Sequence, residues 1–284
     1  MKNYIAYIVF VILSTFFMFL PRRVSIAFGN FFGSFLYYCM PIRKKVIKIN
    51  LQIAYPNLTK YKLKNLILKT YKHFGIMFSE FLRQKKININ DIIIDETTKT
   101  ILSKKDGFIL LTAHFGNWEM FLPILNKYKK TSAVVKIQRN LGGDKYVSKL
   151  RKFNNITLLP SSGSNRKMIQ SLLNNEVLLL ASDQNAGKKG IKVPFFNKET
   201  SLPKGAPYFY HKTKSSIMIG FCNLNSDYSY TFTIKSLDFE SSDNLEDLFV
   251  NINIAYSKVL ENEINKYPNQ YFWFHKKWDK GIYR

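Results

Sequence analysis

The middle of the sequence is dominated by short apolar runs that alternate with stretches of helical character. Runs short enough to be buried strands cover residues 108–112, 133–137, 156–159 and 177–181. Stretches with helical spacing lie between them, at residues 117–127, 142–153 and 164–173. Strands that alternate with helices usually pair in parallel, because each helix carries the chain back across the sheet. The pattern predicts an α/β fold with a mixed, largely parallel sheet flanked by helices.

Further elements extend this pattern in both directions. Residues 215–222 and 228–234 add two strands, which can form a hairpin, and residues 244–266 predict a long helix. Before the sheet, residues 43–55 and 59–83 predict two helices that Pro56 separates, with Thr59 able to cap the second. The simplest division places a membrane segment at 1–42 and one globular domain at 43–284.

The N-terminal region predicts a membrane anchor. Residues 4–20 form an apolar run without charges, at the short end of the about 17–25 residues that a transmembrane helix needs. Bulky residues follow it where a signal peptide would need a small-residue cleavage site, so cleavage is not expected. Basic residues are concentrated after the run, which places the C-terminal bulk in the cytoplasm. A second apolar stretch at 24–40 is compatible with an interfacial helix, a core helix or a second span.

The charge balance narrows the class of partner. Lys and Arg number 43 against 19 Asp and Glu, which gives a formal net charge of +24. Such a surface attracts anionic lipid, phosphorylated substrates, acidic proteins or nucleic acid. The two cysteines, Cys39 and Cys222, lie in no CxxC pair and at no metal-ligand spacing, and no nucleic-acid motif is present. The cysteines therefore indicate no metal or redox cofactor site, and nucleic acid is not expected as a partner.

One short segment carries a chemical signature. In residues 110–119, LLTAHFGNWE, an apolar strand ends at His114, Gly116 permits a tight turn, and Asn117 is a suitable helix N-cap. Glu119 then falls in the first helical turn. A carboxylate so placed can orient the imidazole, which leaves the other ring nitrogen to take a proton from a hydroxyl as a general base. Equally, His114 is compatible with a core histidine, and Glu119 with a carboxylate that only stabilises the helix dipole.

These residues resemble a known family. HFGNWE at 114–119 is similar to the H-x-x-x-x-D/E motif of the lysophospholipid acyltransferase superfamily, and more narrowly to bacterial lipid A late acyltransferases of the lauroyl and myristoyl transferase type. Further blocks agree in order and spacing, at residues 138–140, 147–151, 182–187, 193–196 and 267–277. The resemblance spans nearly the whole chain.

The resemblance implies a fold, a reaction and a location. It implies a lysophospholipid-acyltransferase-like domain at 43–284 that acts in lipopolysaccharide biosynthesis. The donor would be a thioester of acyl carrier protein, and the acceptor a hydroxyl of a 3-hydroxyacyl chain on an anionic lipid A precursor. The enzyme would be held on the cytoplasmic face of the inner membrane by a single-pass anchor and would contact its anionic lipids.

The resemblance also implies site residues. His114 would be the base and Glu119 its orienting partner. Arg151 would bind an acceptor phosphate or stabilise the oxyanion, although it could equally be a solvated charge on a basic helix. Asp183 would hold the site or bind the acceptor, or be only a turn residue. Two further residues would contact substrate, Arg139 and Asn117.

Two alternatives to lipid A stay open at this stage. One is another acyltransferase of the same superfamily with a different phospholipid or glycolipid acceptor. The other is a basic, membrane-bound protein that binds nucleic acid and has no enzymatic activity.

Overall fold

A seven-stranded sheet forms the centre of the computed structural model, which describes residues 2–284. The strand order is β1-β9-β8-β2-β5-β3-β4. The strands are β1 (Ile92–Ile94), β2 (Ile109–Thr112), β3 (Thr131–Val135), β4 (Ile156–Pro160), β5 (Val177–Ala181), β8 (Ile217–Leu224) and β9 (Tyr230–Ser236). Neighbours pair in parallel except β8 and β9, which form an antiparallel hairpin. The predicted α/β fold with a largely parallel sheet is confirmed.

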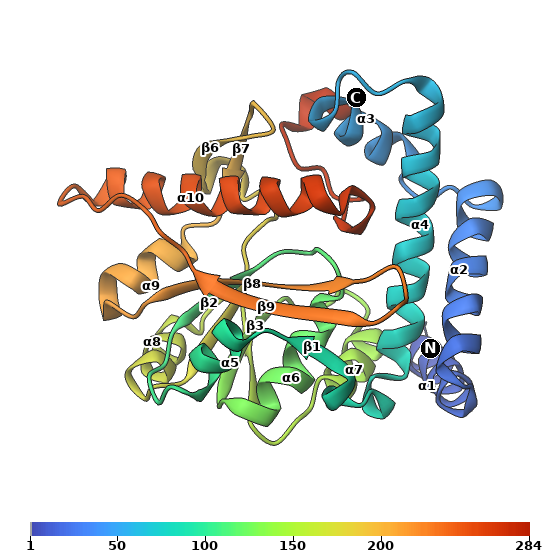
Figure 1. Ribbon diagram of the computed structural model, residues 1–284, viewed down its shortest axis with the longest axis horizontal. Helices are drawn as coiled ribbons and strands as arrows, with labels where there is room; N and C mark the ends of the chain where they lie inside the picture. Colours follow the sequence, from blue (N-terminus) through green and yellow to red (C-terminus); the bar gives the residue numbers. More distant parts are fainter. Residues whose placement is uncertain (1) are drawn as a thin grey trace.

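Helices surround this sheet and extend beyond it on one side (Figure 1). They are α1 (Lys2–Phe19), α2 (Arg22–Cys39), α3 (Lys44–Ala54), α4 (Lys60–Leu82), α5 (Glu96–Ser103), α6 (Phe121–Tyr128), α7 (Leu141–Leu150), α8 (Asn165–Leu173), α9 (Gly205–Thr213) and α10 (Leu245–Lys266). As predicted, Thr59 caps α4: its hydroxyl accepts a hydrogen bond from the Lys62 amide at 3.3 Å. Single 3-10 turns occur at Gln84–Lys86, Ile89–Asp91, Trp118–Met120, Gly187–Lys189, Pro268–Gln270 and Lys280–Tyr283.

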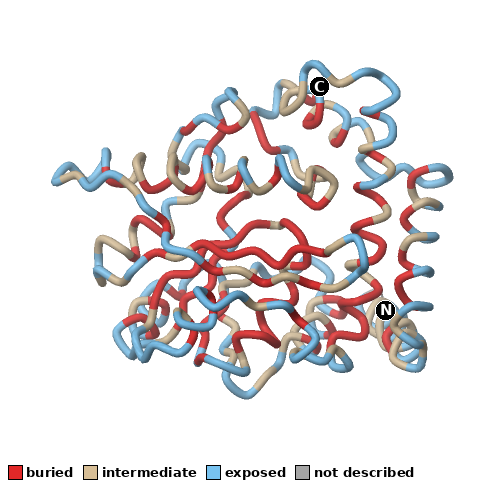
Figure 2. The backbone as a smooth tube through the Cα atoms, in the orientation of Figure 1, coloured by how far each residue is buried: buried red, intermediate tan, exposed pale blue. Residues whose placement is uncertain are grey.

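The central strand β2 shows why the sheet is buried on both faces. Ile109 and Leu111 point into a core that includes α10, whereas Leu110 points into a second core that includes α6. Alternate residues of a strand face opposite sides, so both sides of β2 must be apolar. Figure 2 shows the strands as a buried band across the centre, with exposed segments around it. The end of β2 is therefore a rigid support for the residues that follow it.

Four features were not anticipated from the sequence. They are the edge strand β1, the helices α5 and α9, and a separate antiparallel hairpin of β6 (Ile191–Phe195) and β7 (Lys198–Leu202). The hairpin packs on α10 through β6 instead of joining the main sheet. Buried and exposed residues alternate along β6 but not along β7.

The N-terminal anchor predicted over residues 4–20 is not supported. Within residues 2–284, no helix has both the length and the apolar character needed to cross a membrane. One face of α1 packs on α7 and α4, where Phe10 stacks on Tyr146 at 5.7 Å between ring centroids. The proposed boundary between residues 42 and 43 stays a prediction.

The second apolar stretch forms α2, which packs along α4. Gly29 and Gly33 of α2 face Gly75 and Tyr71 of α4 so closely that a Cβ on any of the three glycines would collide with the backbone of the other helix. Small residues spaced four apart allow two helix backbones to approach in this way. Of the three possibilities that the sequence left open for residues 24–40, the structure shows a helix packed on the domain through one face.

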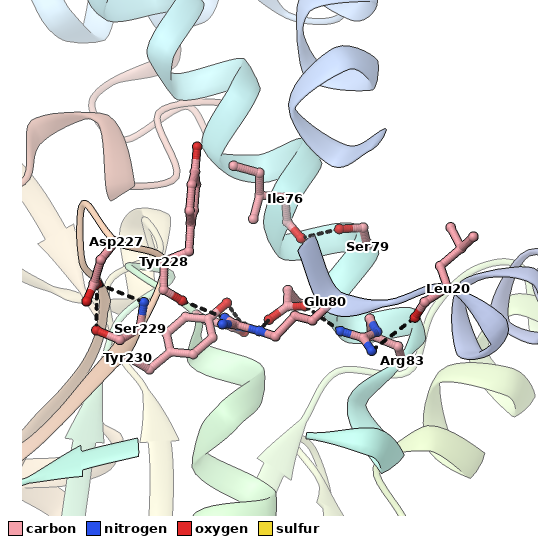
Figure 3. Close-up of polar contacts among 11 residues, drawn as sticks. Leu20, Ile76, Ser79, Glu80, Arg83, Asp227, Tyr228, Ser229 and Tyr230 are labelled. Atoms are coloured by element: carbon pink, nitrogen blue, oxygen red, sulfur yellow. Dashed lines mark hydrogen bonds and ion pairs between the residues drawn. The ribbon is translucent and has the colours of Figure 1, made fainter. Parts of the chain in front are cut away.

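A buried ionic cluster joins these N-terminal helices to the sheet (Figure 3). Glu80 of α4 is fully buried and binds Arg22 of α2 at 3.0 Å and Arg83 at 3.4 Å. Arg22 also donates to the carbonyl of Tyr228 at 2.6 Å, and Arg83 to that of Leu20 at 3.3 Å. Both carboxylate oxygens are thus satisfied, as a buried charge requires. The cluster fixes the α1–α2 junction and the β8–β9 turn against α4.

Candidate active site

The candidate site lies where two neighbouring parallel strands end. β2 and β5 pair in parallel, with Thr112 opposite Ala181. His114 follows the first strand by two residues, and Asp183 follows the second by two residues. The carboxyl ends of parallel strands form one edge of a sheet, which is where α/β proteins commonly place their ligands. Strand pairing alone therefore brings together two residues that are 69 positions apart.

Asp183 holds His114 through two hydrogen bonds, one to the imidazole ring and one to the backbone amide. Nδ1 of His114 lies 2.7 Å from Oδ1 of Asp183, and the backbone amide of His114 donates to the same oxygen at 3.1 Å. An ionised carboxylate only accepts, so Nδ1 carries the proton and Nε2 presents its lone pair. Nε2 faces the side-chain amide of Gln184 at 3.4 Å. The ring is thus oriented as a base, with the reactive nitrogen on the side opposite the carboxylate.

The charges around His114 favour the protonated, positively charged form of its ring. Burial lowers the pKa of His114, but the charge of Asp183 and their hydrogen bond raise it more, so the net pKa lies above its ordinary value. Burial works against ionisation of Asp183, yet His114 and then Lys277 outweigh it and hold the pKa of this carboxyl below its usual range. A carboxylate that stays ionised beside a histidine stabilises the imidazolium that forms during base catalysis.

Glu119 does not bind His114, which corrects the predicted pair. Its carboxylate accepts two hydrogen bonds from Arg151, from Nε at 2.9 Å and from Nη2 at 2.5 Å, and one from the indole nitrogen of Trp118 at 3.0 Å. Glu119 is the middle residue of the 3-10 turn Trp118–Met120, and its side chain reaches Arg151 at the end of α7. The ion pair is nevertheless close enough to act on the imidazole: Glu119 raises the pKa of His114, and Arg151 lowers it.

The loop between His114 and Glu119 is fixed by its neighbours on all sides. Gly116 has a φ of +60°, and a Cβ there would collide with the carbonyl of Cys222, so the position requires glycine. Its carbonyl faces Nε2 of the buried His73 at 3.2 Å. Burial lowers the pKa of His73 to about 4, so this ring is neutral and donates. His73 thus has a structural role in holding this loop.

Asn117 is held inside the protein next to the candidate site. Its side chain is buried, and its amide donates to the hydroxyl of Tyr230 at 2.9 Å. It precedes the 3-10 turn as expected of an N-cap, but its side chain forms no capping hydrogen bond. The guanidinium of Arg22 lies over the ring of Tyr230, 5.4 Å from its centroid. The contact of Asn117 with substrate stays a prediction.

The remaining predicted residues divide into two groups. Asp183 and Arg151 come together around His114, although with partners that differ from those expected. Arg139 lies exposed on the loop between β3 and α7, and the structure assigns it no contact in the site. Neither Gln184 nor Lys277 was predicted as a site residue. The signal that could have found Gln184 is its place directly after Asp183, behind an apolar strand.

Trp118 packs beside the imidazole, with 5.1 Å between the ring centroids of Trp118 and His114.

This geometry defines a class of site. Within the described chain, the side-chain partners of the imidazole are Asp183 and Gln184, and neither is a nucleophile of the serine or cysteine kind. A histidine base oriented by a carboxylate, without such a partner, is suited to activating a hydroxyl of the substrate itself. Such a site is suited to group transfer in which the acceptor itself brings the nucleophile.

Comparison with known proteins identifies the family. The model of the bacterial lipid A biosynthesis acyltransferase family matches residues 1–280, so the chain belongs to that family and is an acyltransferase. It is similar to the lipid A biosynthesis lauroyltransferase of Escherichia coli, with 22% identity over 91% of this chain and 86% of the relative. It is also similar to the palmitoleoyltransferase of the same pathway in Escherichia coli, with 19% identity over 91% of this chain and 86% of the relative.

A solved structure also matches. The 1-acyl-sn-glycerophosphate acyltransferase of Thermotoga maritima aligns with 87% of this chain and 98% of its own, at 13% identity and a TM-score of 0.37.

Proposed function

We propose that this protein transfers a fatty acyl chain from an acyl carrier protein thioester to a hydroxyl of a 3-hydroxyacyl chain on a lipid A precursor. The observation that carries the proposal is the orientation of His114: Asp183 occupies Nδ1, so Nε2 is the nitrogen available to an acceptor hydroxyl. The family model and the relatives support the acyl transfer and the lipid A acceptor class. The carrier-protein donor follows from the sequence resemblance.

The chemistry needs one base and no covalent enzyme intermediate. The acceptor hydroxyl displaces the long contact of Gln184 and gives its proton to Nε2 of His114 as its oxygen attacks the thioester carbonyl. The tetrahedral intermediate then collapses, the carbon–sulfur bond breaks, and the thiolate takes the proton from the imidazolium. One ester forms and one thioester is lost. Asp183 stabilises the transient imidazolium throughout, in place of the Glu119 expected from the sequence.

Arg151 supplies positive charge beside the base. Nε and Nη2 of its guanidinium bind Glu119, and Nη1 is the group that we assign to an oxyanion or to an acceptor phosphate. Glu119 positions this guanidinium, because a bidentate pair fixes the plane of the fork. The exposed Arg139 is assigned to an acceptor phosphate on charge alone.

The N-terminal helices provide a surface for lipid contact without a span. One face of α2 packs on α4, while the outward faces of α1 and α2 expose large apolar side chains, among them Ile5, Ile12, Phe28, Phe31 and Phe35. With a net charge of +24, the chain is suited to a membrane interface rich in anionic lipid. We assign the enzyme to the cytoplasmic face of the inner membrane on this basis.

The lipid contact is tested by sedimentation with anionic vesicles. Phe31→Ser with Phe35→Ser should reduce the bound fraction several-fold, since each removes apolar area from the outward face of α2. Leu245→Ser at the start of α10 is the control, because Leu245 is exposed on another part of the surface. Equal losses in both variants, or none in either, would remove the assignment to this face.

The reaction is tested with defined acyl carrier protein thioesters and a tetra-acylated lipid A precursor in detergent micelles. A mass gain of one acyl chain, lost in His114→Ala, is the expected result. Lysophosphatidic acid and native lipid extracts are run in parallel as acceptors. Acylation of those alone would keep the enzyme class and replace the acceptor, whereas full activity of His114→Ala would remove the proposed base.

A further inference from the structure

A lysine lies buried directly beneath the candidate site. Lys277 is 1% exposed, although lysine is among the residues least often buried. Its ammonium group lies over the ring of Phe195, 4.4 Å from the centroid. A buried ammonium loses its hydration and must recover the cost from specific partners. The partners of Lys277 therefore indicate what the residue is for.

The ammonium group binds the turn that carries Asp183. Nζ of Lys277 donates to the backbone carbonyl of Asp183. The backbone of Lys277 holds the surrounding chain: its carbonyl accepts from Asn185 at 2.9 Å and from Thr200, and its amide donates to the hydroxyl of Tyr283 at 3.0 Å. The side chain and the main chain of one residue thus hold the turn at Asp183 and again at Asn185, two residues later.

The same C-terminal segment also fixes His114. The amide of Phe272 donates to the carbonyl of His114 at 2.9 Å, and the amide of Gly116 donates to the carbonyl of Gln270 at 3.0 Å. Phe115 and Tyr271 form an antiparallel bridge between these bonds. Residues 270–277 therefore contact both members of the His114–Asp183 pair, one through the backbone and the other through Lys277.

We infer that Lys277 is a positioning residue of the His114–Asp183 pair: its buried ammonium fixes the backbone of Asp183 and offsets the charge of the carboxylate, so that the imidazole gives up its proton more readily than it would beside an unbalanced carboxylate. The inference rests on the proposed base function of His114. Without this positive charge, the carboxylate of Asp183 would favour the protonated form of His114 more strongly, and in that form Nε2 cannot accept a proton from a hydroxyl.

The charges around Lys277 support this role. Burial lowers the pKa of Lys277 to about 8, against the opposing effects of Asp183 and of Glu261 on α10. Lys277 in turn contributes to the lowered pKa of Asp183 and of His275. The titratable groups that face this cluster are Asp183, Glu261, His114, His275, Tyr256, Tyr271 and Tyr283. Glu119 and Arg151 act on His114 from its other side, where Glu119 raises the pKa of His114 and Arg151 lowers it. Burial raises the pKa of all three tyrosines, so they are neutral where the enzyme works.

The direct test is the titration of His114, followed by NMR in the full chain with labelled histidine. The chain has 4 histidines, so His114→Gln identifies the signal. In Lys277→Met, removal of a nearby positive charge should raise the pKa of His114 by about one unit. Lys277→Arg keeps the charge and should leave the pKa near its original value. Lys276→Met, at the exposed neighbouring position, should leave it unchanged.

Activity provides the second measurement. The kcat/KM of Lys277→Met should fall on the order of 100-fold near neutral pH, and its acid limb should move to higher pH. A purely structural role would lower the rate and the melting temperature without moving this limb. An unchanged pKa of His114 in folded Lys277→Met would overturn the inference. Because the NMR titration needs no turnover, a lack of transferase activity in the wild type would count against the proposed function alone.

Discussion

Two carboxylates lie near His114, and they differ in what they bind. Asp183 is buried, follows the end of β5 and shares one oxygen between the ring and the backbone amide of His114. Glu119 is five residues from His114 in the chain, yet its two oxygens bind Arg151 and Trp118. The carboxylate that is near His114 in sequence thus forms an ion pair with Arg151. The carboxylate that is near His114 in the sheet binds its imidazole.

The difference shows that the partner of a side chain depends on the element that carries it. A residue just past a strand is held by the register of its neighbours, and this restricts where its side chain points. A residue in the turn that begins a helix instead faces whatever packs on that turn, here the end of α7. The motif therefore contributes the proposed base and a carboxylate that binds Arg151, and the carboxylate that binds the imidazole comes from another part of the chain.

The largest expected effect is the loss of the base itself. His114→Ala should reduce kcat about 10⁴-fold, because no other imidazole in the site is placed to accept the proton from the acceptor. The assay is acyl transfer from carrier-protein thioesters, with circular dichroism to confirm the fold. His211→Ala on α9 serves as the control and should retain full activity. Turnover close to wild type in His114→Ala would show that His114 is not the base, so neither carboxylate could act through it.

The next effect separates the two carboxylates. Asp183→Asn keeps the shape but loses the charge and the tautomer control, so kcat should fall about 10³-fold. Glu119→Gln should cost less in rate and should destabilise the fold by about 1–3 kcal/mol, because Arg151 loses its partner. Single-turnover rates and thermal unfolding measure the two. The reverse order of rate losses would restore Glu119 as the orienting group.

The pH profile sharpens the same contrast. The base must be neutral, and the pKa of His114 lies above its ordinary value of about 6.5, so kcat/KM of the wild type should rise through that higher pH. Asp183→Asn removes the largest effect that raises this pKa, and its acid limb should move to lower pH by about one unit or more. Glu119→Gln should move the limb in the same direction by less. Initial rates between pH 5 and pH 9 (about the stable range of most folds) provide the comparison.

The smallest expected effect is at Gln184. Its amide lies 3.4 Å from Nε2 of His114, which is a long contact for a hydrogen bond. Gln184→Ala should change kcat/KM by only about 2- to 10-fold, the equivalent of one neutral hydrogen bond. Initial rates over a range of donor concentrations would show whether the change lies in KM or in kcat. A loss as large as that of Asp183→Asn would mean that Gln184 belongs to the catalytic pair.

Local patterns predicted most of the elements and the position of the proposed base. The apolar run at 177–181 predicted β5 to the residue, and the strand–glycine–asparagine sequence after β2 located His114 at a sheet edge. Such signals are local, because the period of a strand and the demands of a tight turn depend on a few adjacent residues. The weak elements β1, β6 and β7 were missed because three to five residues with polar neighbours carry too little pattern.

The partner of each charge was decided by the tertiary structure alone. Which carboxylate meets His114 depends on β5 lying beside β2 although β3 and β4 come between them in the chain. The burial of Lys277 beneath Asp183, and the packing of α2 on α4 through facing glycines, depend likewise on segments far apart in sequence. By itself the sequence determined which residues could ionise and where strands would end. The fold decided which charges meet, because hydrogen bonds and ion pairs act over a few ångströms that only packing brings about.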